Sequence, residues 1–279
     1  MKTTLLEIRQ AVRTAILAEI DIEDVGDVCF AAGSTHVMKT CSIGGDKYFL
    51  KFSDASLFDE GDPSLQILVE YLAYKIYSLY KGVTIPKVDL VYDRDGQKVG
   101  LASSAVKGKM AGDIRMDPKK LGKMLSAGVY VDIFLANWDV VGTGSGNVMV
   151  GNKDVATRID PGGSLTYRAQ GGRKGQKFGE KPGELKTMLD PSFGGSGNVF
   201  QYSDLKKAGM VFSSVPFGAV EHAIMETDEQ VSDELRSHDM KKLLSAWKAD
   251  VKLIAGVLRK RHTEVMAHVK YVIDDQKHR

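Results

Sequence analysis

The chain has 279 residues, 43% of them hydrophobic, which is enough for one large domain or two lobes. Its formal net charge of +2 gives no field that favours nucleic acid or an anionic membrane as the main partner. No apolar run approaches the ~18 residues of a membrane span, and the charged stretch 1–20 is typical of an amphipathic helix rather than a signal peptide. Cys29 and Cys41 could form a disulfide but fit a reducing compartment better, so we expect a cytoplasmic protein.

Three strand-like segments follow an acidic linker, at residues 28–32, 36–43 and 47–52. Glycines at the second connection predict a tight hairpin. The first connection consists of Gly33, Ser34 and Thr35. A glycine followed by two hydroxyl residues is either an ordinary turn or a loop whose backbone N–H groups cover phosphates.

A lysine interrupts the apolar third strand and is followed by a long helical pattern. Lys51 either faces solvent from an edge strand or serves a buried site. The helix is expected from Pro63 to about Lys81, because proline is favoured in a first turn and apolar residues then recur at helical spacing. Glu70 lies off that apolar stripe, so it is either a solvated surface residue or the partner of Lys51. Glu60, in the polar loop before the helix, is the weaker alternative partner.

Two further strands, 83–91 and 100–106, would complete a five-stranded antiparallel sheet. At residues 107–110 the periodicity changes from that of strands to that of helices. We expect the boundary between two lobes there, with residues 1–106 in the first lobe and 107–279 in the second. The segment 118–135 is expected to be helical.

Three polar residues stand at the ends of apolar segments in the middle of the chain. Asp139 closes an apolar run, Asn147 ends a loop rich in glycine, serine and threonine, and Asp160 follows two short strand-like segments. Each residue alone could be an ordinary turn former. Together they suit phosphoryl transfer, in which one carboxylate orients the attacking hydroxyl while an asparagine and a second aspartate hold Mg²⁺.

The order of these residues resembles the catalytic core of atypical protein kinases over about residues 28–165. It is most similar to actin-fragmin kinase and HipA-type toxin kinases, and more distantly to phosphatidylinositol kinases. Asp139 matches the catalytic-loop Asp, Asn147 the metal-binding Asn, and Asp160 the Asp of the Asp-Phe-Gly element. Two features depart from ordinary kinases: the gap between Asp139 and Asn147 is longer, and Asn-Trp replaces the His-Arg pair before the Asp.

The resemblance implies an α+β fold with two kinase-like lobes, an antiparallel-sheet N-lobe and a mainly helical C-lobe. It also implies ATP and Mg²⁺ as cofactors, with Lys51, paired to Glu70, on the nucleotide phosphates. Gly33, Ser34 and Thr35 would then cover those phosphates.

In the same resemblance, backbone groups of Ser104, Ala105 and Val106 would contact adenine. The basic, glycine-rich stretch 167–177 occupies the place of an activation loop, although a disordered surface loop is an equal alternative. Helices are expected at 202–209, 215–226, 227–236 and 239–273, and the basic cluster 259–262 is expected on a solvated helix face.

These residues favour an ATP-dependent phosphotransferase, and within that class a Ser/Thr protein kinase acting on another protein. A catalytically silent binding module competes with this function, but the presence of every acidic and amide position argues against it. Transfer of AMP in place of phosphate, and transfer to a lipid or a small molecule, are also compatible with the sequence. No metal-ligand cluster of cysteine and histidine is visible in the sequence.

Overall fold

The computed structural model describes residues 26–29, 36–43, 46–53, 62–92, 96, 98–169 and 171–275. The predicted N-terminal helix, the predicted phosphate loop of Gly33, Ser34 and Thr35, and Glu60 lie outside these residues. So do the side chains of Cys29 and Cys41.

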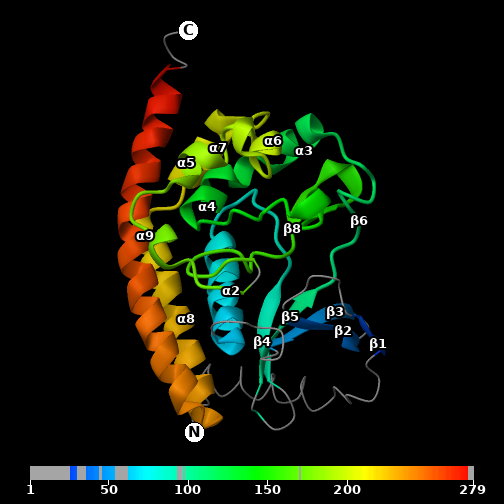
Figure 1. Cartoon of the computed structure of the whole chain (residues 1–279), viewed down its shortest axis with the longest axis vertical. Helices are drawn as coiled ribbons and strands as arrows, with labels where there is room; N and C mark the ends of the chain where they lie inside the picture. The colour runs from blue at the N-terminus through cyan, green and yellow to red at the C-terminus, as the bar shows by residue number, and fades with distance from the viewer. Residues whose placement is uncertain are drawn as a thin grey trace, which may run out of the picture.

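An antiparallel sheet of five strands forms one end of the molecule (Figure 1). The strands lie in the order β1-β2-β3-β5-β4, with bounds β1 (Gly26–Cys29), β2 (His36–Ile43), β3 (Asp46–Ser53), β4 (Val88–Tyr92) and β5 (Val99–Ser104). The predicted five-stranded sheet is thereby confirmed. Strand β4 begins later than Val83, and the carbonyl of Thr84 accepts the N–H of Arg158 at 3.0 Å, which ties Thr84 to a second sheet.

Helix α2 (Pro63–Tyr77) lies between the sheet and the C-terminal helices (Figure 1). Asp62 caps its first turn, accepting the N–H groups of Ser64 at 2.9 Å and Leu65 at 3.2 Å. The helix ends before the expected Lys81. It contacts β3, β4 and β5 as well as helices α8 and α9, so it is buried on nearly every face and has no solvated side.

The second sheet is small and holds the middle of the chain. Its antiparallel strands are β6 (Lys109–Met110), β7 (Val148–Val150) and β8 (Ala156–Arg158), in the order β6-β7-β8. The expected hinge at 107–110 therefore contains a short strand. The predicted helical segment 118–135 is found as α3 (Pro118–Leu125), a 3₁₀ turn η3 (Ser126–Gly128) and the buried helix α4 (Val129–Phe134).

The rest of the chain is helical, and its last two helices run side by side along the molecule (Figure 1). The α-helices are α5 (Glu184–Thr187), α6 (Gly197–Phe200), α7 (Leu205–Ser213), α8 (Phe217–Ser237) and α9 (Lys241–Asp275). Short 3₁₀ turns are η4 (Thr143–Ser145), η5 (Asn152–Asp154), η6 (Gly175–Lys177) and η7 (Pro191–Phe193).

Two sequence predictions about these helices are wrong. The expected break at Thr227 is absent, because its hydroxyl donates to the Ala223 carbonyl at 2.7 Å and the helix continues. The basic cluster 259–262 is not wholly solvated, because Arg261 is completely buried. A buried guanidinium and a solvated one look alike in a helical sequence pattern, since only tertiary contacts distinguish them.

One continuous core joins α2, one face of β4 and β5 (Leu90, Val99 and Leu101), and helices α4, α7, α8 and α9. A small separate cluster of Leu50, Val91 and Ala102 covers the other face of the sheet. The architecture is thus α+β and kinase-like, with a small antiparallel sheet and one helix set on a mainly helical part. In the stretches that the structure describes, no helix is both long and apolar enough to cross a membrane. The lobe boundary after residue 106 stays a prediction, because α2 packs against both parts.

Candidate active site

Lys51 lies on the inner strand β3, between β2 and β5, and pairs with Leu101 across the sheet. Its side chain is 13% exposed, and its Nζ lies 2.8 Å from Oε2 of Glu70. The alternative of a solvated lysine on an edge strand is therefore wrong.

Glu70 projects from α2 and is 3% exposed, so the solvated alternative is wrong for it as well. A second carboxylate approaches the same ammonium: Oδ1 of Asp160 lies 3.1 Å from Lys51 Nζ, with the Asp160 side chain 48% exposed. One cation thus faces two carboxylates, one buried and one open to solvent. Among the described residues, this cluster therefore sets two carboxylates against one ammonium.

The pKa values reflect this imbalance. Burial lowers the pKa of Lys51, but the charges of Asp160 and Glu70 outweigh burial, so its pKa lies above the ordinary lysine value. Burial raises the pKa of Glu70 to about 7 against the opposing effect of Lys51, and the charge of Asp160 adds to the rise. The ammonium is therefore firmly charged, while its two carboxylates compete for it.

The long loop between Asp139 and Asn147 folds back on itself. The Asn147 Nδ2 donates to the Asp139 carbonyl at 2.7 Å and to Asp139 Oδ2 at 3.2 Å. Gly142 makes this closure possible, since its φ is +74° and a Cβ there would lie 2.7 Å from Asn147 Cγ. With its nitrogen bound to Asp139, Asn147 can offer only its amide oxygen to a cation.

Asp160 lies beside this loop at the end of β8. The N–H of Ile159 donates to the Asn147 carbonyl at 3.1 Å, which places Asn147 next to the strand end that carries Asp160. A Cβ on Gly162 would lie 3.0 Å from both Asp160 Oδ1 and Glu70 Oε2, so a larger residue would have to displace one of these carboxylates slightly. Residues 160–162, Asp-Pro-Gly, therefore differ from the kinase element Asp-Phe-Gly only at Pro161.

Asp139 is half-buried and lies near Asp160. Burial raises its pKa, the hydrogen bond from Asn147 lowers it, and the charge of Asp160 raises it. A Cβ on Gly163 would come within 3.4 Å of Asp139 Cβ, which shows how closely the turn after Asp160 packs on the loop that begins at Asp139. The structure therefore brings Asp139, Asn147 and Asp160 together.

Within the described residues, no group of three or more His, Cys, Asp or Glu side chains could hold a metal ion. One carboxylate and one amide oxygen nevertheless suit Mg²⁺, which usually takes one or two protein carboxylates and completes its shell with water and phosphate. Asp160 and Asn147 supply this pair. Their donor chemistry fits a metal that arrives with a nucleotide, not one bound permanently.

Two of the backbone N–H groups that were expected to contact adenine are already hydrogen-bonded within the protein. The N–H of Ser104 donates to the Lys87 carbonyl at 2.9 Å, and the N–H of Ala105 donates to the Lys47 carbonyl at 2.8 Å. These two amides are therefore not available to a base. A nucleotide contact by Ser104 or Ala105 would have to use a carbonyl group, while the contact predicted for Val106 is unaffected.

A buried charge network beneath the catalytic loop was missed by sequence reasoning. Arg158 donates to Asp132 from Nε at 2.8 Å and from Nη2 at 2.7 Å, and Tyr77 donates to Asp132 Oδ1 at 2.8 Å. Asn137 Nδ2 in turn donates to the Tyr77 hydroxyl at 3.0 Å. The signal that could have revealed it is a charged residue inside each of two apolar runs.

The basic stretch 167–177 is folded wherever the structure describes it, so the disordered alternative is wrong. Tyr167 and Arg173 form a β-bridge, and Arg173 Nη1 contacts both carboxylate oxygens of Asp250 on α9, at 2.7 and 2.6 Å. Lys174 is buried, although no pattern in the sequence separates it from its charged neighbours. The role of this stretch in substrate binding stays a prediction.

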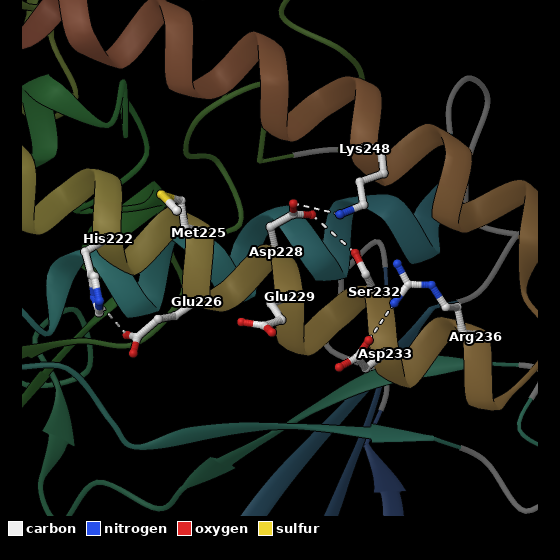
Figure 2. A pocket seen from close by; sticks show the side chains of 9 residues that line it. All are labelled: His222, Met225, Glu226, Asp228, Glu229, Ser232, Asp233, Arg236 and Lys248. Atoms are coloured by element: carbon white, nitrogen blue, oxygen red, sulfur yellow. Dashed lines mark hydrogen bonds and ion pairs between the residues drawn. The ribbon is translucent and has the colours of Figure 1, made fainter. Parts of the chain in front are cut away.

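A surface hollow of ≈ 490 Å³ on α8 offers a second region to consider (Figure 2). Its lining residues are His222, Met225, Glu226, Asp228, Glu229, Ser232, Asp233, Arg236 and Lys248. Most of its charges are paired with one another, as Lys248 is with Asp228 at 2.8 Å and Arg236 with Asp233 at 2.5 Å. The hollow is therefore lined by surface ion pairs with a surplus of two carboxylates over its lysine and arginine, whereas the Lys51 cluster is built around a buried Lys–Glu pair.

No family model matches this chain, and no curated protein matches it. Among solved structures, a MAP kinase from Leishmania major covers 93% of this chain and 87% of its own, at 14% identity and a TM-score of 0.36. The α+β architecture is defined by the order of its own elements and by the geometry described above.

Proposed function

We propose that the protein is a Mg-ATP-dependent phosphotransferase, and within that class a Ser/Thr protein kinase that acts on another protein. One observation carries the proposal: the Lys51 ammonium lies between Glu70 at 2.8 Å and Asp160 at 3.1 Å. A strand lysine paired with a helix glutamate beside a metal-binding aspartate is the arrangement that protein kinases require.

The residues divide the work of phosphoryl transfer among them. Lys51, held by Glu70, would bind the nucleotide phosphates, and Asn147 and Asp160 would bind Mg²⁺. The Mg-ATP supplies the phosphoryl group and neutralises the charge that develops on it. Asp139 would orient the acceptor hydroxyl, whose oxygen bonds to the γ-phosphorus as the bond to the ADP oxygen breaks. The hydroxyl proton passes to the Asp139 carboxylate, whose pKa burial has already raised.

The end of the basic stretch supports a protein kinase in particular. Residues 182–184 are Pro-Gly-Glu, of which only Glu184 agrees with the Ala-Pro-Glu element that closes the activation loop of kinases. Glu184 is buried and accepts from Arg261 Nη2 at 2.7 Å. An ordered segment anchored at both ends suits the docking of a protein acceptor. We also propose that the chain is related to the actin-fragmin and HipA-type kinases.

The test uses ATP labelled at either the α or the γ phosphate, incubated with the protein and Mg²⁺, alone and with cell lysate. We expect γ label on protein, none in lipid or small-molecule fractions, and none with the variant Asp139→Asn. Label from the α position would show AMP transfer and overturn the proposal. Binding of ATP without transfer in any fraction would identify a silent module.

A further inference from the structure

Lys174 is a buried lysine that the proposed chemistry does not use. The residue is 9% exposed, and its Nζ donates to the Ala136 carbonyl at 2.5 Å and to the Gly163 carbonyl at 2.7 Å. In the part of the chain that the structure describes, no carboxylate lies within ion-pair distance of this ammonium. Its two partners are therefore backbone carbonyl groups from separate turns.

Those carbonyls belong to the two turns that carry the site. Ala136 lies three residues before Asp139, and Gly163 lies three residues after Asp160. Ala136 has a φ of +55°, a strained conformation for a residue with a Cβ, which needs support from its surroundings. Lys174 thus supports a strained turn and fastens it to the turn on the metal side.

The backbone of Lys174 is itself held in place. Its N–H donates to the Thr166 carbonyl at 2.9 Å, and the preceding Arg173 is bound by Asp250 of α9. The lysine therefore approaches the two carbonyls from a fixed base. A side chain on a fixed base can set the distance between the turns, whereas one on a loose loop would only follow them.

The charges around Lys174 oppose one another. Burial lowers its pKa to about 7; the charge of Glu184 on α5 raises it, and Arg261 on α9 and Arg168 lower it. Glu184 is bound to Arg261, so it is shared between two cations. Below about pH 7 Lys174 carries three N–H donors, and above it the neutral amine keeps two, enough for both carbonyls.

We propose that Lys174 is a positioning residue that clamps the turn carrying Asp139 to the turn after Asp160. The clamp sets the alignment of the hydroxyl-orienting carboxylate with the metal-binding residues. Its effect on catalysis rests on the proposed phosphotransferase function, but its effect on the two turns does not. Because misplacement by about 1 Å can cost ~10²-fold in rate, such a clamp matters without contacting the substrate.

The test compares Lys174→Met with Lys177→Met, which removes an exposed lysine from the same stretch. We expect Lys174→Met to lower kcat by about 10–100-fold while KM for ATP changes less than about twofold. Lys177→Met should match the wild type in both. Lys174→Gln, which keeps two N–H donors, should recover part of the lost kcat.

Amide hydrogen exchange separates the clamp from the chemistry. In Lys174→Met, exchange should accelerate at residues 136–139 and 160–165 and stay unchanged in α8 and α9. Normal kcat with unchanged exchange in both turns would overturn the clamp, and a uniform rise throughout the chain would make Lys174 a stabilising residue only. If the wild type transfers no phosphate to any acceptor, the proposed function fails, and the exchange result still decides the clamp. If Lys174→Met does not fold, exchange and kcat of Lys174→Gln decide it by the same criteria.

Discussion

Two buried charge clusters lie close together in this protein, and they differ in how their charges balance. In the first, Arg158 meets Asp132 through two hydrogen bonds, and Tyr77 and the Leu125 carbonyl occupy further positions. Both charged side chains are at most 3% exposed. One cation and one anion are enclosed together, with hydrogen bonds on several sides.

In the second cluster, Lys51 meets two carboxylates, and Asp160 is half exposed. Burial is similar for Glu70 and Asp132, so burial does not distinguish the clusters. Charge balance does: the enclosed pair is one cation with one anion, whereas among the described residues the other cluster sets one ammonium against two carboxylates. A cation delivered with a ligand would restore the balance, which is why we assign structure to the first and binding to the second.

The largest effect should come from breaking the enclosed pair. Arg158→Met would leave Asp132 as a buried anion without its cation, and we expect a loss of about 3–5 kcal/mol in the free energy of unfolding. The double variant Arg158→Met with Asp132→Leu should recover most of that loss, as no charge stays buried. Urea denaturation measures both. Equal losses in the single and double variants would show that the pair is not a closed unit.

Lys51→Met should lower activity and leave stability nearly unchanged, in contrast to Arg158→Met, which lowers stability. The apolar stem is kept, so the protein should fold, while the rate of phosphoryl transfer falls ~10²–10³-fold, or about 3–4 kcal/mol in the barrier. Lys47→Met on the same strand is the matched control, because Lys47 is exposed. Single-turnover transfer from labelled ATP provides the measurement. Undiminished transfer by Lys51→Met would remove this lysine from the site.

Ligand addition should complete the unbalanced cluster. At 100 times its Kd, Mg-ATP should add about 2.7 kcal/mol to the free energy of unfolding and raise Tm accordingly. Asp160→Ala should lose most of this shift. Asp154→Ala should keep it, because Asp154 is exposed and paired with Lys120 at 2.7 Å. If Asp160→Ala kept the shift and Asp154→Ala lost it, the metal ligand would be Asp154 and not Asp160.

The smallest effect concerns pH. The pKa of Glu70 is raised from 4.5 to about 7, so its contribution to stability is present below about pH 4.5 and is lost as pH rises through about 7. We expect the stability difference between wild type and Glu70→Gln to change in that window by on the order of 1–3 kcal/mol. Transfer activity should rise over the same window, because the ionised form holds Lys51. A flat difference in denaturation free energy from pH 4.5 to 7 would contradict the shift.

The local patterns in the sequence were sufficient for the sheet. They left Glu70 as either a solvated residue or the partner of Lys51, and the resemblance to kinases supplied the pairing that the structure shows. A hairpin glycine, a proline at a helix start and alternating apolar residues are signals carried by neighbouring positions. The order of Asp139, Asn147 and Asp160 along the chain predicted the hydroxyl-orienting and metal-binding residues of the site. Their roles in binding and catalysis stay predictions.

Other features depend on contacts between distant positions and could not be read locally. Arg261 sits in a basic run that is typical of a solvated helix face, yet it is fully buried. Lys174 sits in a glycine-rich basic stretch, where nothing marks it apart from its charged neighbours. Both side chains bind backbone carbonyl groups, and Arg261 binds the Glu184 carboxylate as well. Every residue has a carbonyl group, so no local sequence pattern marks such partners.

Arg261 also bears on when the site can form during synthesis. Its Nη2 donates to the Ile133 carbonyl at 2.5 Å and its Nε to the Phe134 carbonyl at 2.9 Å, at the end of α4 just before the catalytic turn. Phe134 precedes Arg261 by 127 positions. At roughly 5–20 residues per second, that end of α4 is made about 6–25 s before the donor that completes it. A ribosome-bound chain therefore holds every residue from Lys51 to Asp160 while the turn bearing Asp139 still lacks its support from α9.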